Sequence, residues 1–289
     1  MHSGKISLTH LAVLLCLAVF AYSTGSAASP QNGLLKVYFF DVGQGDAIFI
    51  EAPNGSQVLV DGGPDNKILS RLGEVMSFYD RDIDLMIATH PHADHIAGLI
   101  DVLKRYDLKN IIEAKESYDS PEFKAWEEAV KNENANNIEA IAGKVVDLSG
   151  GLTLTILHPF ESVVGDNPQN PHDDVVVMML KYGGLKIMLT GDMEQKIERR
   201  LILAGESLDS DILKVGHHGS KTSTVEEFLY EISPQIAIIQ VGVKNRYGHP
   251  SPETLNRLEN FGIKYYRTDV DGDIKVVSDG ENFKIITDN

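Results

Sequence analysis

The sequence predicts an α/β fold in which two β-sheets are covered by helices. Apolar, β-branched runs punctuated by glycine or aspartate occur near both ends of the chain, and segments with helical spacing of apolar residues lie between them. Because a sheet and a helix each bury one apolar side, this order favours helices packed on two sheets. With 289 residues, 43% of them hydrophobic and 24% charged, the chain can bury one large core without disulfides.

The first 28 residues differ in composition from the rest and predict a signal peptide. Lys5 lies in a short polar start, an apolar run follows at 11–22, and Ser26-Ala27-Ala28 is typical of a cleavage site. The alternative is a retained membrane anchor, but the run is shorter than the roughly 20 residues that cross a bilayer. We therefore expect a secreted, extracellular or cell-envelope protein with no stable membrane span after cleavage. The predicted organisation is a signal peptide at 1–28, a linker at 29–33 and one domain at 34–289.

The mature chain is expected to be strongly acidic and free of cysteine. Removing Lys5, the only charge in the predicted signal peptide, leaves 25 basic against 42 acidic residues, a net charge of about −17. Such a surface repels bulk DNA or RNA, so a nucleic-acid substrate would have to be bound locally by metal ions and a few lysines or arginines. The simpler interpretation is that the charge keeps an exported protein soluble. Cys16 lies in the signal peptide, which excludes thiolate metal ligands from the mature chain.

The first half of the domain predicts a β-meander followed by a βαβ unit. Helical spacing of apolar residues is followed by a largely apolar strand of the kind buried on both faces. The predicted strands are 34–40, 47–51, 57–60 and 83–89, with a helix at 66–79 before the last of them.

The same alternation of strands and helices continues to the C-terminus. A charged, Asn-rich stretch at 114–143 interrupts it, with a weak helical pattern around Phe123, Trp126 and Val130. This stretch is either an inserted helical flap or a solvated connection. The remaining predicted strands are 110–113, 152–157, 175–181, 185–190, 211–215 and 235–241, and the remaining helices are 96–106, 193–203, 223–232 and 251–261.

Four candidate metal ligands follow the buried strand 83–89 and precede a predicted helix. His90 and His92 are two residues apart on extended backbone, so they project to the same side and can hold one ion, while Asp94 and His95 can hold a second. Three histidines and an aspartate are costly to place together without a cation. Imidazole with carboxylate suits Zn²⁺ and tolerates Mn²⁺ or Fe.

Two later strand ends carry similar side chains. Asp192 follows a buried strand, where its carboxylate could bridge two ions or cap the next helix, and these two roles are compatible. His217 and His218 follow the strand at 211–215 beside a glycine-rich turn. His158, at the end of the strand 152–157, has no other candidate ligand beside it in the sequence and is interpreted as structural.

These motifs together resemble the metallo-β-lactamase superfamily. The run His90-Pro91-His92-Ala93-Asp94-His95 is similar to its HxHxDH signature, and Leu59-Val60-Asp61-Gly62-Gly63 is similar to its first motif. The resemblance extends from Asp41–Ala47 to Tyr247–Pro250 and is strongest to the extracellular hydrolase domain of the ComEC family of competence DNA-uptake proteins. It implies that 34–289 forms a four-layer αββα sandwich with two divalent metal ions, Zn²⁺ or alternatively Mn²⁺, and that the domain hydrolyses phosphodiesters, DNA among them.

The resemblance also implies roles for individual residues. Asp192 matches the bridging ligand, and His218 matches the ligand to the second ion, which leaves His217 to orient it or to touch substrate. His172 matches a first-ion ligand, with Asp173 or Asp174 as alternatives if the alignment shifts. His249 matches a histidine that could bind a phosphate oxygen or protonate a leaving group, or it could simply enter the next helix. Asp61 would accept a hydrogen bond from the ring N–H of a ligand histidine and so fix its tautomer.

The expected mechanism is hydrolysis by a hydroxide shared between two ions, which Asp94 would orient. Candidates for neutralising the charge on phosphate or for contacting the substrate are Lys214, Ser220, Lys221, Tyr247 and His249. One alternative is hydrolysis of a small ester, lactone, β-lactam or choline-type phosphoester in an apolar pocket built by 114–143. Another is a metal-binding protein that keeps the fold without turnover. No feature of the sequence indicates an oligomeric state.

Overall fold

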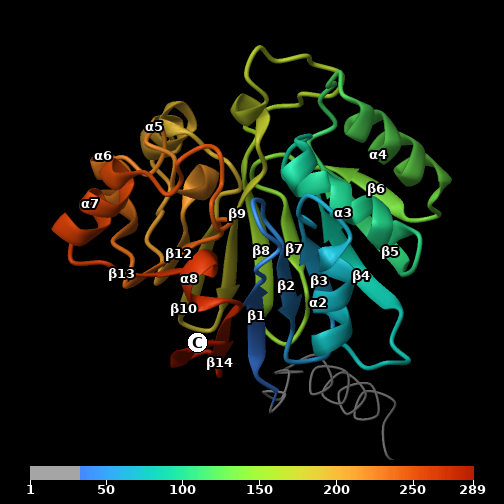
Figure 1. The fold of residues 1–289 in the computed structure, drawn as a ribbon, viewed down its shortest axis with the longest axis horizontal. Coiled ribbons are helices and arrows are strands. Elements are labelled where there is room, and N and C mark those ends of the chain that lie inside the picture. The colour runs from blue at the N-terminus through green and yellow to red at the C-terminus, as the bar shows by residue number, and fades with distance from the viewer. Residues whose placement is uncertain (1–32) are drawn as a thin grey trace, which may run out of the picture. The chain divides into compact units, whose positions relative to one another are not determined.

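The computed structural model describes residues 33–289, and these residues are built around two β-sheets (Figure 1). The predicted signal peptide and residues 29–32 of the predicted linker lie outside the described residues. No helix of the described part is long and apolar enough to cross a membrane.

The first sheet has eight strands in the order β15-β14-β1-β2-β3-β4-β5-β6. β1, β2 and β3 pair antiparallel in chain order, which confirms the predicted meander, whereas β3 to β6 run parallel. The carboxyl ends of β3 and β4 therefore lie side by side at one end of the sheet. The strands are β1 (Leu35–Phe39), β2 (Ile48–Glu51), β3 (Gln57–Val60), β4 (Asp82–Ile87), β5 (Asp107–Glu113), β6 (Asn136–Glu139), β14 (Ile274–Ser278) and β15 (Phe283–Thr287).

The second sheet has seven strands in the order β13-β12-β11-β10-β9-β8-β7. β10 to β13 are parallel, so the carboxyl ends of β10, β11 and β12 also meet at one end of the sheet. The strands are β7 (Val145–Asp147), β8 (Leu152–His158), β9 (Val177–Tyr182), β10 (Leu185–Leu189), β11 (Ile212–Lys214), β12 (Ile236–Ile239) and β13 (Lys264–Arg267).

Helices cover the outer face of each sheet. Buried residues of α2, α3 and α4 pack on the first sheet, those of α5, α6 and α7 pack on the second, and a third apolar cluster fills the space between the sheets. The expected four-layer αββα sandwich is therefore confirmed. The helices are α2 (Lys67–Val75), α3 (Ala93–Leu103), α4 (Pro121–Asn132), α5 (Gln195–Ala204), α6 (Glu226–Ile232), α7 (Pro252–Asn260) and the short α8 (Thr268–Asp271).

Several predicted helix boundaries differ from the structure, and two of the differences bear on the site and on the core. α3 begins at Ala93, not at residue 96, so Asp94 and His95 belong to its first turn. α2 ends at Val75, before the predicted residue 79, because Phe78 and Tyr79 continue the apolar spacing but find no core and are 80% and 89% exposed. Apolar spacing alone does not extend a helix where there is no surface to pack against.

The stretch 114–143 forms the inserted helix and not a solvated connection. Ser120 caps α4 by accepting a hydrogen bond from the Phe123 amide at 3.0 Å, and Pro121 occupies the first turn. Trp126 is buried and donates to Glu113 at 2.7 Å. The same stretch also supplies the edge strand β6, which the sequence did not predict.

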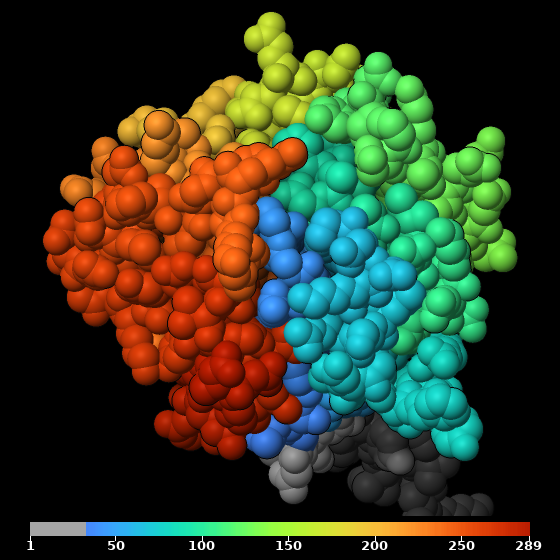
Figure 2. Space-filling model, viewed as in Figure 1, coloured from blue at the N-terminus to red at the C-terminus, as the bar shows by residue number. Residues whose placement is uncertain are grey.

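Figure 2 shows how the two halves of the chain meet. The N-terminal half, coloured blue to green, and the C-terminal half, orange to red, lie side by side along a seam. The strand ends that carry the candidate ligands come from both halves.

Candidate metal centre

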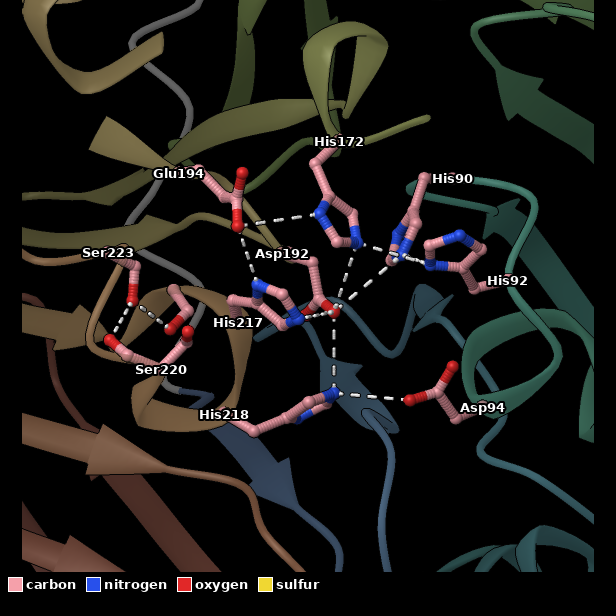
Figure 3. Close-up of polar contacts among 12 residues, drawn as sticks. His90, His92, Asp94, His172, Asp192, Glu194, His217, His218, Ser220 and Ser223 are labelled. Atoms are coloured by element: carbon pink, nitrogen blue, oxygen red, sulfur yellow. Dashed lines mark hydrogen bonds and ion pairs between the residues drawn. The ribbon is translucent and has the colours of Figure 1, made fainter. Parts of the chain in front are cut away.

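Histidine and aspartate side chains from several loops converge at the carboxyl ends of the parallel strands (Figure 3). The β4–α3 connection and the first turn of α3 supply four of them, and the short helix Pro171–Asp174 before β9 supplies His172. Asp192 follows β10, and His217 and His218 follow β11. The carboxylate of Asp192 lies at the centre of the group.

His90, His92 and His172 form the first ligand group, which we call the first site. The Nε2 of His90 lies 3.1 Å from Nδ1 of His92, and the Nε2 of His172 lies 3.2 Å from the same atom. Three imidazole nitrogens facing one point match a tetrahedral zinc site that keeps one open position. The alternatives Asp173 and Asp174 do not join this group, and Asp173 instead pairs with Lys196.

Asp94, His95, Asp192 and His218 form the second ligand group, which we call the second site. The Nε2 of His218 is 3.4 Å from Asp94 Oδ2 and 3.5 Å from Asp192 Oδ2, and the Nε2 of His95 is 3.4 Å from Asp192 Oδ1. Asp192 also approaches the first site, with Oδ2 3.7 Å from His90 Nε2 and 3.9 Å from His172 Nε2. Its carboxylate is therefore placed between the two sites.

The residues present fit two divalent cations. Asp192 Oδ1, His95 Nε2 and His218 Nε2 are buried, face the second site and have no hydrogen-bond partner in the described part of the chain. Buried polar atoms are normally paired, so orphaned donors and acceptors that point at one another indicate a ligand position. Imidazole with carboxylate is the donor set that zinc accepts and manganese tolerates.

Unusual backbone conformations hold the ligands in place. Asp61, His217 and His218 adopt positive φ angles of 56°, 47° and 52°, a region that non-glycine residues rarely occupy. The second turn of α3 approaches the loop after β3 so closely that a Cβ on Gly98 would lie 1.9 Å from the carbonyl oxygen of Gly62. Glycine is therefore required at residue 98 for α3 to present Asp94 and His95.

Asp61 supports the second site as the resemblance implies. Its carboxylate lies 2.7 Å from Nδ1 of His95 and accepts hydrogen bonds from the amide and the hydroxyl of Thr89. This contact leaves Nε2 of His95 free to face Asp192. The arrangement is the carboxylate–histidine pairing that fixes the tautomer of metal ligands.

Glu194 plays the corresponding part for the first site, and sequence reasoning missed it. Its Oε1 lies 3.2 Å from Nδ1 of His217 and 3.8 Å from Nδ1 of His172, and it also accepts from the Thr222 hydroxyl at 2.7 Å. Glu194 stands two residues after Asp192, where an acidic residue is also expected to open α5. No local signal distinguishes these two roles.

The two sites differ in protonation. Burial lowers the pKa of His90 well below its usual range and that of His92 to about 4, so both imidazoles are neutral. Burial also acts to lower the pKa of His218, but the carboxylates of Asp192 and Asp46 outweigh it and raise this pKa to about 10. A cation that binds the second site must therefore displace a proton from His218, whereas one that binds the first site finds His90 and His92 deprotonated.

An open cavity of about 330 Å³ gives access to both sites. Tyr118, Ser120 and Glu122 line it from the inserted segment, and Tyr247 and His249 line it from the loop after β12. The Tyr247 ring stacks on His249 with centroids 5.9 Å apart, and His217 lies 5.6 Å from His249. His217, Tyr247 and His249 are thus placed where a substrate would lie. The lining is polar, unlike the apolar pocket that the small-ester alternative expects.

Three candidate phosphate contacts lie outside this cavity. Lys214 is fully buried in an ion pair with Asp46, and its ammonium does not reach the cavity. Ser220 is turned away from the ligands (Figure 3). Its hydroxyl contacts that of Thr222, and the Lys221 side chain faces solvent. Lys214 is lost to the substrate because it points into the sandwich, whereas Ser220 and Lys221 lie beyond the turn that carries His217 and His218. His158 also lies outside the cavity, buried and 2.8 Å from the carbonyl oxygen of Val175, in keeping with a structural role.

Residues 40–243 match the family model described as Metallo-beta-lactamase superfamily. The chain therefore belongs to this superfamily, whose members are generally metal-dependent hydrolases. The fold agrees with the crystal structure of CmlA, a diiron β-hydroxylase from Streptomyces venezuelae, at a TM-score of 0.52 and 15% identity, covering 95% of this chain and 60% of that one.

Competence proteins are among its relatives, as the sequence motifs suggest. ComE operon protein 3 of Bacillus subtilis is 31% identical over 291 residues, which covers 94% of this chain and 36% of that protein. Competence protein ComA of Neisseria gonorrhoeae is 28% identical over 271 residues, covering 90% of this chain and 34% of that protein. The chain thus spans about a third of the length of these curated relatives. The resemblance to the ComEC family is confirmed.

Proposed function

We propose that the chain is an exported phosphodiesterase that uses two divalent metal ions, Zn²⁺ or Mn²⁺, and that its substrate is DNA. The observation that carries this proposal is the placement of Asp192 between two complete ligand groups at the floor of one open cavity. Similarity to competence proteins favours a nucleic-acid substrate over other esters.

The side chains of the chain itself would orient the reaction. The carboxylates of Asp94 and Asp192 face the second site, where they can accept hydrogen bonds from an attacking water and orient it. Burial and the neighbouring His217 lower the pKa of His249 to about 4, so this imidazole is neutral at pH 7 and its N–H can donate to a phosphate oxygen. This favours the phosphate-binding role of His249 over protonation of the leaving group.

When bound, a pair of divalent ions lowers the pKa of water towards about 7 and offsets charge on the phosphate. This is the local cation that an acidic protein needs to hold a polyanion. Arg246 adds a positive side chain beside the cavity, where its guanidinium donates to the Tyr247 hydroxyl at 2.8 Å. An open, polar cavity suits a chain-like substrate better than a compact ester.

The test is a hydrolysis screen on the purified protein, freed of chelators and then loaded with Zn²⁺ or Mn²⁺. The substrates are single-stranded DNA, double-stranded DNA, a bis-aryl phosphate and a β-lactam. We expect hydrolysis of DNA and of the bis-aryl phosphate, with loss of both in Asp192→Asn. Glu198→Gln, a buried carboxyl-to-amide change away from the cavity, is the matched control and keeps activity.

Two outcomes would contradict the proposal. Turnover of the β-lactam without turnover of either phosphodiester would favour the small-ester alternative. Binding of two zinc ions without turnover of any substrate would favour a metal-binding protein that has lost catalysis. Export is tested separately by fractionating the producing cells and sequencing the N-terminus of the mature protein, which we expect to begin at Ser29.

A further inference from the structure

Lys214 is an ammonium buried within the sandwich, next to the second site. It is the last residue of β11, its side chain has no exposed surface, and its Nζ forms an ion pair with Asp46. Nζ also donates to the carbonyl oxygen of Gly191 at 2.9 Å. Burying a charged pair costs desolvation energy that the pair itself often fails to offset. Such a pair therefore calls for an explanation other than stability.

Both partners of Lys214 connect directly to ligands of the second site. Gly191 precedes Asp192, so the hydrogen bond from Nζ fixes the turn that aims the bridging carboxylate. Asp46 Oδ1 lies 3.3 Å from Nδ1 of His218, opposite the Nε2 that faces the site. The carbonyl oxygen of Gln240 lies 2.9 Å from the same Nδ1, so two acceptors hold this ring.

The backbone of Asp46 connects to a third ligand. The Asp46 amide donates to the carbonyl oxygen of Asp94 at 3.2 Å, and the Asp46 carbonyl accepts from the Gly63 amide at 2.8 Å, two residues after Asp61. The loop between β1 and β2 is thereby joined to the first turn of α3 and to the loop after β3. Asp46 and Lys214 together contact the surroundings of Asp94, Asp192 and His218.

The pair has no corresponding feature at the first site in the part of the chain that the structure describes. There, the support comes from Glu194, whose side chain is 22% exposed. A buried pair of opposite charges adds no net charge to the metal centre. Its main contribution to the second site is therefore the orientation of His218 and Asp192.

We propose that Asp46 and Lys214 are positioning residues that set the affinity of the second site for its cation and leave the first site unchanged. This inference rests on the proposed function, since it requires two metal sites. Outer-shell partners of metal ligands typically change metal affinity by about 10- to 100-fold. We expect an effect of that size, confined to one of two binding events.

The experiment is a Zn²⁺ titration of the metal-free protein by calorimetry, with bound zinc counted by elemental analysis. Lys214→Met leaves Asp46 charged, buried and unpaired, so that variant risks unfolding. The decisive variant is therefore D46N/K214M, which removes both charges together. We expect two binding events in the wild type, and in D46N/K214M an unchanged first event with the second weakened about 10- to 100-fold. Glu198→Gln controls for a buried carboxyl-to-amide change and keeps both events.

Every other outcome has a defined meaning. If D46N/K214M binds both ions as the wild type does, the inference is wrong and the proposed function stands. If the double variant weakens both events equally, or is unfolded by circular dichroism while Glu198→Gln is folded, the pair supports the domain as a whole and the inference is wrong. If the wild type itself binds fewer than two ions, the proposed two-metal function fails first.

Discussion

The two halves of the metal centre share one loop but are built differently. The first site consists of three imidazoles near the cavity, backed by one partly exposed carboxylate, Glu194. The second site combines carboxylates with imidazoles and is backed by the buried residues Asp61, Asp46 and Lys214. The difference teaches that ligand type follows from the sequence motif, whereas the rigidity of each site depends on residues behind it.

The largest expected effect belongs to the residue that both sites share. Asp192→Asn removes the negative charge between the two ligand groups, so both cations are expected to lose affinity at once. We expect hydrolysis of a bis-aryl phosphate to fall by more than about 100-fold, the upper end of the effect of outer-shell partners. Steady-state kinetics with zinc analysis measure this. Retention of two tightly bound ions would show that Asp192 does not bridge.

Single-ligand variants separate the sites. His172→Ala removes an imidazole from the first site only, and His218→Ala removes one from the second only. Each is expected to reduce bound zinc from two equivalents towards one after dialysis, because it removes an imidazole donor from one site and leaves the ligands of the other site intact. Elemental analysis of dialysed protein provides the count. Loss of both ions in either variant would mean that the two sites fill as one unit.

Substitutions of the two carboxylates that support the ligands are expected to lower zinc affinity by different amounts. Asp61→Asn disturbs a fully buried carboxylate that also holds Thr89, so we expect an effect near the upper end of about 10- to 100-fold on zinc affinity. Glu194→Gln, at a partly exposed position, is expected near the lower end. Competition with a chelator of known affinity compares the two. A larger loss of zinc affinity in Glu194→Gln than in Asp61→Asn would mean that the first site depends more on its supporting carboxylate than the second site does.

The smallest effect concerns stability and depends on pH. Glu116 lines a small cavity with His90, and burial raises its pKa from about 4.5, the usual value of a glutamate, to about 8. The folded protein therefore binds this proton more tightly than the unfolded chain does, and stability falls as the pH rises between these two values. Glu116→Gln is expected to raise the free energy of unfolding by at least about 1 kcal/mol at about pH 9.

The same variant supplies its own control, since the carboxyl is protonated in both states below its unfolded pKa. We expect no measurable change in the free energy of unfolding at about pH 4. Urea unfolding at the two pH values measures both quantities. An equal stabilisation at both pH values would mean that the substitution acts through packing and not through the charge.

Much of the fold could be predicted because the patterns that indicate strands and helices depend on residues close together in the sequence. The strand before His90 is a largely apolar run, and the spacing of His90, His92, Asp94 and His95 already divides the ligands between two ions. Errors arose where packing decides a boundary. α2 stops at Val75 although its apolar spacing continues. α3 starts at Ala93, where its first turn is held by a hydrogen bond from the Gly62 amide, in the loop after β3, to the carbonyl oxygen of His95.

The sequence by itself determined the ligand types, the strand ends that carry them and the alternation of elements that makes two layered sheets. The spacing of residues along one strand or helix fixes the direction in which their side chains point, and it can be recognised without knowing which distant residues lie nearby. Only the tertiary structure decided that Glu194 faces His172, that Lys214 turns inward to Asp46, and that Ser220 leaves the cavity. Those contacts join segments far apart in the chain, and they exist only after the two sheets have packed together.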